Sequence, residues 1–206
     1  MSDEHRIGLC GGTFDPFHRG HLDPIAGVYD ALEWAKVIFI PANRQPFKTD
    51  RTPASAFHRF GMAVLATEDD DRFEVSPMEL ERGEVSYTVD TLERVRGAHR
   101  EATLDWIIGD DNLELLPKWR SLERIFELAN FVVLRRGSHS LPAQFASRRT
   151  LPRERLRAGG IVVVDNVAVP ISATEIRERA AAGKAIVDLV DARVERYIRK
   201  NGIYQE

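Results

Sequence analysis

The sequence predicts an α/β fold built on a parallel sheet that is covered by helices on both faces. Short runs of β-branched and other apolar residues recur along the chain, as in Val37–Ile40 and Ile161–Val164. Segments with apolar residues at helical spacing separate these runs. Continuous apolar strands that alternate with helices are typical of a doubly wound, Rossmann-like parallel sheet, in which both faces of each strand are buried.

Six strands are expected, and two of them end at residues that interrupt an extended run. The first, Ile7–Cys10, is followed by Gly11 and Gly12, and the second, Val37–Ile40, is stopped by Pro41. The others are Phe73–Val75, Leu104–Ile108, Phe131–Leu134 and Ile161–Val164. Ligands of such sheets bind beyond the carboxyl ends of the strands, so the residues that follow the strands are candidates for a functional site.

Helices are expected between the strands, because apolar residues recur there every three or four positions. The second of these helices would have an apolar side made of Phe57, Phe60, Val64 and Leu65. The predicted helices are His21–Trp34, Pro53–Thr67, Thr88–Val95, about Ala173–Ala182 and Val187–Lys200. We expect one domain over residues 1–206, with the C-terminal helices (about 172–206) packed on the sheet as a small subdomain.

The composition is that of a globular protein with a slightly acidic balance. Of the 206 residues, 43% are hydrophobic and 30% charged, and 29 Lys and Arg face 32 Asp and Glu, for a net charge of −3. The length allows a sizeable core. The charge argues against unspecific binding to a nucleic-acid backbone.

The single cysteine, Cys10, excludes an intrachain disulfide framework and is typical of a reducing compartment. No apolar run approaches the roughly 18 residues needed to cross a bilayer, and the polar start of the chain does not resemble a signal peptide. We therefore expect a cytoplasmic protein without a membrane partner. The Arg-rich stretch Arg135–Gly160 is interpreted as a solvated insertion, while an anion site or a homo-oligomer contact stays open.

The most informative segment is Gly11–His21, which follows the first strand. Its two leading glycines allow the backbone to approach a bulky anion. A helix begins near Gly20, and its N-terminus offers free N–H groups and partial positive charge. His18 and His21, three residues apart, can both point at one phosphate chain and donate hydrogen bonds to it. This pattern indicates a nucleotide phosphate site.

Other phosphate and catalytic motifs are absent from the sequence. It contains no Gly-x-Gly-x-x-Gly fingerprint, no Walker A sequence and no Gly-x-Ser-x-Gly elbow. A zinc site built from Cys10, His18 and His21 is conceivable, but no second Cys/His cluster completes four ligands. We therefore predict no metal ligated by these side chains.

Gly11–His21 resembles the Gly-Gly-(Thr/Ser)-Phe-Asp-Pro-x-His-x-Gly-His signature of bacterial nicotinate (nicotinamide) mononucleotide adenylyltransferases, members of the nucleotidyltransferase superfamily named for its His-x-Gly-His motif. Three later segments resemble motifs of the same family, in the same order, so that the resemblance covers nearly the whole chain. They are Ser86–Leu92 (Ser-Tyr-Thr-x-Asp-Thr, at the pyridine pocket), Ile108–Trp119 (Gly-x-Asp…Leu…Trp) and Ile171–Arg177 (Ile-Ser-x-Thr-x-Ile-Arg, at the phosphates).

The resemblance implies an ATP site and an acceptor site. Catalytic roles fall on Thr13, His18, His21 and Arg177. ATP contacts fall on these residues and on Gly11, Gly12, Phe14, Gly109, Asp111, Ile171, Ser172 and Thr174. Acceptor contacts fall on Asp15, Lys48, Tyr87, Thr88, Val89, Trp119 and Arg135, with the Trp119 ring stacked on the pyridine.

The chain departs from the family pattern at two positions. Where the family often has Pro-His-Lys, this chain has Phe47 before Lys48, so only Lys48 can carry an anion contact there. Where the family commonly has Gly-Ala-Asp, this chain has Gly109-Asp110-Asp111. Aligning the glycines assigns the ribose contact to Asp111, and Asp110 stays open as the alternative.

Ser172 has two compatible interpretations. It is a good N-cap residue, and Glu175 completes the spacing of a capping box. The same helix start can also bind phosphate, with Arg177 adding a bidentate charge, and the motif favours this second role. Trp106 and Trp34 are interpreted as packing residues, and Glu68–Asp71 as a solvated turn at a helix end.

The implied reaction transfers the adenylyl group of ATP to nicotinate mononucleotide, giving deamido-NAD and pyrophosphate, a step of NAD biosynthesis. The nucleophile is already a phosphate anion, so the reaction needs alignment and charge stabilisation rather than a general base. Mg²⁺ would be held mainly by the ATP phosphates. The alternatives are an adenylyl- or cytidylyltransferase with another phosphorylated acceptor, and an inactive nucleotide-binding regulatory module.

Overall fold

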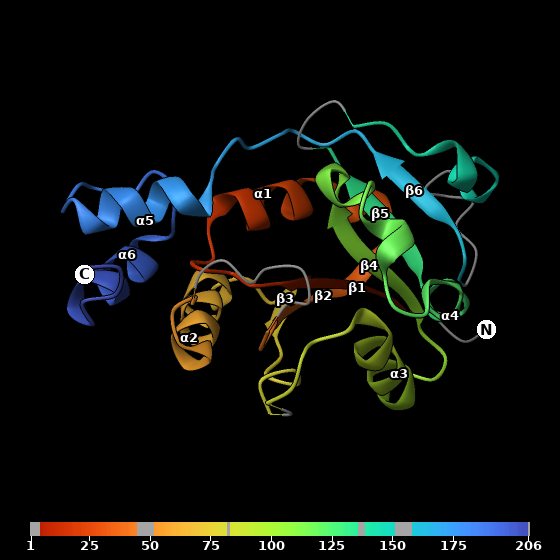
Figure 1. Ribbon diagram of the computed structural model, residues 1–206, viewed down its shortest axis with the longest axis horizontal. Coiled ribbons are helices and arrows are strands. Elements are labelled where there is room, and N and C mark those ends of the chain that lie inside the picture. The colour runs from red at the N-terminus through yellow and green to blue at the C-terminus, as the bar shows by residue number, and fades with distance from the viewer. Residues whose placement is uncertain (1–4, 45–51, 82, 136–138, 151–157, 206) are drawn as a thin grey trace.

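The computed structural model describes residues 5–44, 52–81, 83–135, 139–150 and 158–205. In this part of the chain six parallel strands form one sheet in the order β3-β2-β1-β4-β5-β6 (Figure 1). The strands are β1 (Arg6–Gly12), β2 (Trp34–Pro41), β3 (Phe73–Val75), β4 (Thr103–Gly109), β5 (Asn130–Leu134) and β6 (Ile161–Val164). The predicted doubly wound α/β fold is confirmed.

The strand order reverses at β1. The chain builds outward from β1 to β2 and β3, and then returns to add β4, β5 and β6 on the other side. In the register, Leu9 of β1 is opposite Ile38 of β2 and Trp106 of β4. A crevice beyond the carboxyl ends of the strands forms at such a reversal, which here lies between β1 and β4. The segments that follow Gly12 and Gly109 therefore meet at the expected ligand position.

Six α-helices connect or follow the strands in the described residues. They are α1 (Arg19–Val28), α2 (Ala56–Thr67), α3 (Thr88–Ala98), α4 (Leu122–Leu128), α5 (Ala173–Ala181) and α6 (Ala192–Lys200). Short 3₁₀ helices occupy Asp30–Leu32, Asp110–Asn112, Leu116–Lys118 and Ala143–Arg148. No helix in the described ranges is both long enough and apolar enough to cross a membrane.

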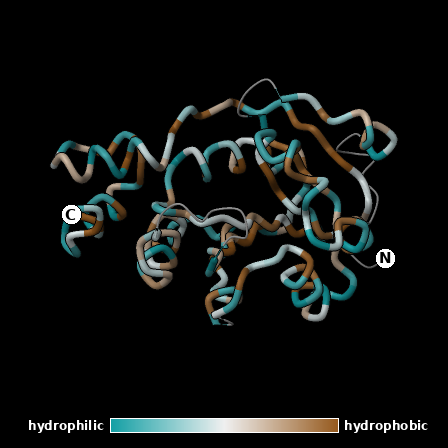
Figure 2. Tube along the Cα trace, viewed as in Figure 1, coloured by the Kyte–Doolittle hydropathy of each residue, from teal (hydrophilic) through white to brown (hydrophobic). Residues whose placement is uncertain are grey.

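Each face of the sheet has its own hydrophobic cluster. On one face, side chains of α3 and α4 such as Leu92 and Phe126 pack against Leu9 and Trp106 of the strands. On the other face, Ile25 of α1 and Ala63 of α2 belong to a second cluster with strand residues that include Phe39 and Val132. Figure 2 shows the hydrophobic residues concentrated along the strands between these helices. Burial on both faces explains why the strand sequences are continuously apolar.

A third cluster holds the C-terminal helices against α2. It joins Met62 of α2 to Ile176 of α5 and Ile198 of α6, and it contains no strand residue. Figure 1 shows α5 and α6 together at one end of the molecule, beside α1 and α2 and far from α3 and α4. The C-terminal helices were expected to pack on the sheet, whereas this cluster packs them on α2.

The structure corrects several predicted boundaries. The first helix ends at Val28, and Trp34 begins β2 instead of ending that helix. Glu33, with a φ of 50°, separates the two elements in the left-handed region. The last helix begins at Ala192, after the Asp191 cap, and the sequence analysis missed α4. Both interpretations of tryptophan as packing are confirmed, since Trp34 and Trp106 are each 4% exposed.

The apolar side predicted for α2 is wrong for Phe57, whose side chain is 84% exposed. The buried residues of this helix are Arg59, Met62, Ala63 and Thr67. They follow the same helical spacing, rotated away from the predicted side, and they include a cation. A hydrophobic count along the helix favours the wrong side because it treats arginine as a solvent-facing residue.

Candidate functional site

The turn after β1 is shaped by aromatic rings of its own chain. A Cβ atom added to Gly11 would lie 2.8 Å from the Trp106 ring, and one added to Gly12 would lie 2.7 Å from the Phe14 ring. Phe14 itself has a φ of 51°, in the left-handed region that residues with a side chain rarely adopt. The two glycines are thus required for internal packing, in addition to any approach of an anion.

His18 and His21 form a stacked pair at the N-terminus of α1. Their ring centroids lie 3.7 Å apart with 27° between the ring planes. The backbone N–H of His18 donates to Nδ1 of His21 at 3.3 Å. Because Nδ1 of His21 accepts, the proton of the neutral ring is on Nε2, and that nitrogen is a donor. The sequence prediction that both imidazoles share one helix start is confirmed as geometry.

A layer of phenylalanine rings supports the pair. Phe14 lies edge-on to His21, with 5.0 Å between ring centroids, and Phe17 lies 5.5 Å from the same ring. Phe14 and Phe17 are 3% and 1% exposed. The predicted ATP contact of Phe14 is therefore restricted to its backbone, because its side chain is buried under His21.

Thr13 occupies the tightest part of the turn. Its carbonyl oxygen accepts a hydrogen bond of 2.6 Å from Nη1 of Arg59. Its Oγ1 atom is buried and has no hydrogen-bond partner within the described ranges. A buried hydroxyl without a partner is costly unless a ligand satisfies it. This observation fits the predicted contact between Thr13 and a phosphate.

The start of α5 faces this turn from the opposite side. A Cβ on Gly20 would lie 3.3 Å from the Cβ of Ile171, so the glycine of the His-x-Gly-His motif allows the two segments to approach. Arg177 donates through Nη1 to the carbonyl oxygen of Asp15 at 2.8 Å and through Nη2 to Oγ1 of Thr174 at 2.9 Å. The sequence motifs around residues 11–21 and 171–177 are thus side by side.

Ser172 caps α5 as predicted, accepting a hydrogen bond from the backbone N–H of Thr174 at 3.2 Å. The capping-box partner does not follow the prediction, because the carboxylate of Glu175 pairs with Arg179 at 2.7 Å. Ser172 and Thr174 are exposed. Their side chains are therefore accessible to a ligand at the helix start.

The two carboxylates after β4 differ in exposure. Asp110 is 1% exposed, and its Oδ1 lies 3.9 Å from Nδ1 of His139. Asp111 is exposed, and its Oδ1 accepts a hydrogen bond of 3.1 Å from Nδ2 of Asn112. Of the two alternatives for a ribose contact, only Asp111 has a carboxylate open to a ligand.

Tyr87 and Trp119 lie on the same face of the sheet. Both pack against the cluster that contains α3, and Trp119 lies edge-on to Phe131 with 5.8 Å between ring centroids. The guanidinium of Arg120 lies over the Tyr87 ring, 4.7 Å from its centroid. Tyr87 is the N-cap of α3, Thr88 its first residue, and the Val89 side chain is buried, so Val89 can offer only its backbone.

Short contacts connect these aromatic residues to the segment Gly11–His21 after β1, which is called the phosphate turn below. The backbone N–H of Ala42 donates to the carbonyl oxygen of Gly12 at 2.8 Å, and that of Asn43 donates to Oγ of Ser86 at 3.1 Å. Ser86 precedes Tyr87 directly. The loop after β2 therefore fixes the distance between the phosphate turn and the start of α3.

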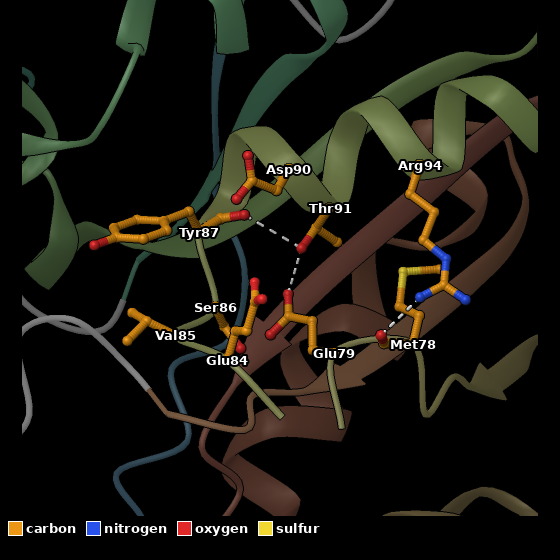
Figure 3. Close-up of a pocket in the computed structure, with 9 residues that line it drawn as sticks. All are labelled: Met78, Glu79, Glu84, Val85, Ser86, Tyr87, Asp90, Thr91 and Arg94. Carbon is orange, nitrogen blue, oxygen red and sulfur yellow. Dashed lines mark hydrogen bonds between the residues drawn. The ribbon is translucent and has the colours of Figure 1, made fainter. Parts of the chain in front are cut away.

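A hollow next to Tyr87 is acidic and does not belong to the phosphate site. Its lining includes Glu79, Glu84 and Asp90 (Figure 3). In the figure the Tyr87 ring points away from it, while Oγ1 of Thr91 donates to Glu79 at 2.6 Å. This hydrogen bond joins the first turn of α3 to the segment that contains Glu79.

The structure does not test the acceptor roles of three further predicted residues. Lys48, with the departure at Phe47, lies outside the described residues. The backbone of Arg135 is bound by Asn166 and its Nε lies 3.2 Å from Oδ1 of Asp165. The Asp15 carboxylate is buried and accepts hydrogen bonds from Tyr204 and from the backbone of Ala54. Their acceptor roles stay predictions.

The sequence analysis missed two cations close to the predicted site. Arg120 follows Trp119 directly, and its position beside the motif was an available signal. Arg59 is 1% exposed, and burial lowers its pKa, while the nearby charge of Asp15 acts in the opposite direction. In the sequence, the only signal for Arg59 is its helical spacing from Met62 and Ala63, which places it on the same side of α2. Within the described ranges, no group of three or more His, Cys, Asp or Glu residues is placed to hold a metal ion.

Fold and site together define a nucleotidyltransferase, and the model of the cytidylyltransferase-like family matches residues 9–179. The chain is 38% identical over 194 residues to a probable nicotinate-nucleotide adenylyltransferase of Corynebacterium jeikeium, covering 94% of this chain and 98% of the relative. It is 37% identical to one of Thermoanaerobacter sp., covering 100% and 97%. The chain therefore belongs to the nicotinate-nucleotide adenylyltransferase family.

The fold is shared with solved structures of distant sequence. A nicotinic acid mononucleotide adenylyltransferase of Plasmodium falciparum, complexed with NaAD, superimposes with a TM-score of 0.76 at 17% identity, over 97% of each chain. A putative nicotinate-nucleotide adenylyltransferase of Vibrio parahaemolyticus gives a TM-score of 0.65, over 98% of this chain and 96% of the other.

Proposed function

We propose that this chain transfers the adenylyl group of ATP to the 5′-phosphate of nicotinate mononucleotide, in the cytoplasm, as a step of NAD biosynthesis. The observation that carries the proposal is the turn after β1. This segment contains both the stacked imidazoles of His18 and His21 and the buried Oγ1 of Thr13, which has no partner among the described residues. The named relatives, similar over the whole chain, support the choice of ATP and of this acceptor.

The transfer forms one P–O bond and breaks another. A phosphate oxygen of the acceptor attacks the α-phosphorus of ATP, and the bond to the β-phosphate breaks, so that pyrophosphate leaves with the electron pair. No proton must be removed from the nucleophile. The protein therefore contributes by aligning the two reactants and by stabilising charge on the phosphate oxygens.

The donors of the site suit that task. Nε2 of His21, a donor, is assigned to the phosphates, and Thr13 positions the transferred group. At the start of α5, Ser172 and Arg177 hold the triphosphate tail. Arg177 reaches Asp15 at 2.8 Å, so its guanidinium is anchored beside the turn.

Mg²⁺ is the proposed cofactor, and the residues present fit it. The side chains assigned to the phosphates are imidazole, hydroxyl and guanidinium groups, which leave phosphate oxygens and water as the ligands that Mg²⁺ prefers. When bound, the ion neutralises charge on the triphosphate. Asp111, the exposed carboxylate nearby, is assigned to the ribose instead.

The experiment that tests the proposal measures pyrophosphate release across a panel of substrates. ATP and CTP are each combined with nicotinate mononucleotide, nicotinamide mononucleotide and two unrelated phosphorylated acceptors, such as phosphopantetheine and glycerol 3-phosphate. We expect release with ATP and the pyridine mononucleotides alone. Release with another acceptor only would identify a different transferase, and no release with any pair would favour a regulatory module.

A further inference from the structure

Two buried charged side chains at the phosphate turn, Asp15 and Arg59, have no role in the proposed reaction. Asp15 and Arg59 are 6% and 1% exposed. Oδ1 of Asp15 accepts a hydrogen bond of 2.6 Å from the hydroxyl of Tyr204 and one of 3.1 Å from the backbone N–H of Ala54. Tyr204 lies 189 positions further along the chain, just after α6. The C-terminal segment thus reaches the turn that follows the first strand.

Arg59 fastens the same turn from α2. Its guanidinium donates to the carbonyl oxygens of Thr13 at 2.6 Å, Ala42 at 2.7 Å, Ala54 at 3.0 Å and Asn43 at 3.3 Å. These carbonyls belong to the phosphate turn, the loop after β2 and the segment before α2. The planar guanidinium, with five N–H groups in a fixed arrangement, can bridge all three in one geometry.

The turn that these contacts hold contains an unfavourable backbone conformation. Phe14, between Thr13 and Asp15, has a φ of 51°, and a residue with a side chain keeps this unfavourable conformation only where its surroundings fix it. Arg177 binds the carbonyl oxygen of Asp15, so α5 contributes a further bond. The backbone on both sides of Phe14 is therefore tied to α2, α5 and the end of the chain.

We propose that Asp15, Arg59 and Tyr204 act as one positioning unit, which holds the Thr13–Asp15 turn in the conformation that adenylyl transfer requires. None of the three contacts the substrate in this role, which differs from the acceptor contact predicted for Asp15 from the sequence. The inference rests on the proposed function. Its consequence is that the segment after α6 contributes to catalysis, since a displacement of about 1 Å at a reacting group costs as much as 10²-fold in rate.

The chain provides a matched control for Tyr204. The hydroxyl of Tyr197, on α6, is 3.0 Å from Nδ1 of His58 on α2. This is also a phenolic hydrogen bond between the C-terminal segment and the rest of the molecule, but it does not reach the turn. Tyr204→Phe and Tyr197→Phe therefore remove the same chemical group, and each removes a tertiary hydrogen bond of a phenolic hydroxyl.

The experiment compares kcat and KM of the two variants with nicotinate mononucleotide and ATP, beside Tm and the Kd of a non-hydrolysable ATP analogue. We expect Tyr204→Phe to lower kcat about 5- to 30-fold with KM and Kd changed less than threefold, and Tyr197→Phe to keep kcat within twofold. Both variants should have similar Tm values. A kcat of Tyr204→Phe within twofold of wild type, or equal losses in both variants, would overturn the inference.

Asp15→Asn provides a second test, because the amide still accepts from Tyr204 but removes the charge next to Arg59. We expect a folded variant with lower kcat and an unchanged Kd for the ATP analogue, and unchanged kcat would count against the unit. If the wild-type protein released no pyrophosphate with any substrate pair, the proposed function would fail instead. The two failures are thus distinguishable.

Discussion

His18 and His21 are held in place by the residues around them. One ring is 4% exposed and the other accepts from the backbone, so neither imidazole is free to rotate. Preorganised donors stabilise developing charge without reorganising during the reaction. The contribution of each ring is therefore expected in turnover more than in folding.

Replacing His18 or His21 by alanine should lower kcat by roughly 10²–10³, the typical loss for one preorganised donor, with little change in Tm. Steady-state kinetics and thermal melts of each variant measure both quantities. His99→Ala, just after α3 and remote from the turn, is the control and should keep wild-type turnover. Nearly unchanged kcat in the two site variants would refute their catalytic assignment.

Asp105 illustrates the opposite case, a polar residue that serves the fold. It is 0% exposed, and its two carboxylate oxygens accept from Nε1 of Trp34 at 2.7 Å and from Nδ2 of Asn130 at 3.1 Å. Trp34→Phe removes the first donor from a buried carboxylate, at a cost of about 1–3 kcal/mol. We expect a Tm lower by about 2–10 °C and unchanged kcat for the folded enzyme. A loss of kcat without loss of Tm would contradict this separation.

Among the helices, α6 is attached to the end of α2 by ion pairs. Asp191 caps α6, and Nη1 of Arg193 lies 2.7 Å from carboxylate oxygens of both Glu68 and Asp69 at the end of α2. The predicted turn at Glu68–Asp71 is thus used for ion pairing. Hydrogen bonds from the Arg193 side chain hold the pKa of Asp191 below its usual value of 3.8.

A lowered pKa in the folded state means that the Asp191 charge stabilises the fold above its usual pKa, and that this stability is lost as the pH falls through the lowered value. Asp191→Asn keeps a capping side chain but loses the charge. We expect a Tm about 1–3 °C lower at pH 7, the scale of a partly exposed pair, and a much smaller difference at an acidic pH below the lowered pKa of Asp191. An equal difference at both pH values would show that capping, not charge, is affected.

The start of α3 determines the expected choice of acceptor. Its backbone N–H groups and the helix dipole favour a ring carboxylate over an amide, which needs an acceptor as well as a donor. Arg120, over the Tyr87 ring, adds positive charge nearby. We expect nicotinate mononucleotide to be preferred by at least about tenfold in kcat/KM, or about 1.4 kcal/mol. Parallel kinetics with both mononucleotides measure this ratio, and equal use of the amide would refute the assignment.

For the whole molecule, the prediction concerns the metal. The phosphate-facing side chains are donors rather than carboxylates, so Mg²⁺ should enter with ATP and dissociate with it. A chelator should abolish turnover, and added Mg²⁺ should restore it. Elemental analysis of purified, nucleotide-free protein should find far less than one equivalent of divalent metal. Stoichiometric retained metal would mean that the protein itself provides the ligands.

The sequence correctly predicts those features of the molecule that depend on neighbouring residues along the chain. The strands, the glycine turn, the Ser172 cap and the two packing tryptophans are each determined by local pattern or by burial of one residue type. It failed where tertiary contacts decide. Arg59 is buried because carbonyls of Thr13 and Ala42, which are distant in sequence, satisfy it together with the nearby carbonyl of Ala54, and no periodicity in its own helix encodes the distant ones. The proximity of Tyr204 to Asp15 is of the same kind.

The bond between Tyr204 and Asp15 also sets an order of events during synthesis. The turn after β1 leaves the ribosome first, yet it receives this hydrogen bond from a residue translated 189 positions later. At about 5–20 residues per second, the nascent turn waits roughly 10–40 s for its last partner. A polypeptide that stalls or terminates before residue 204 contains every residue assigned to the phosphates, but it lacks the contact that closes the turn from behind.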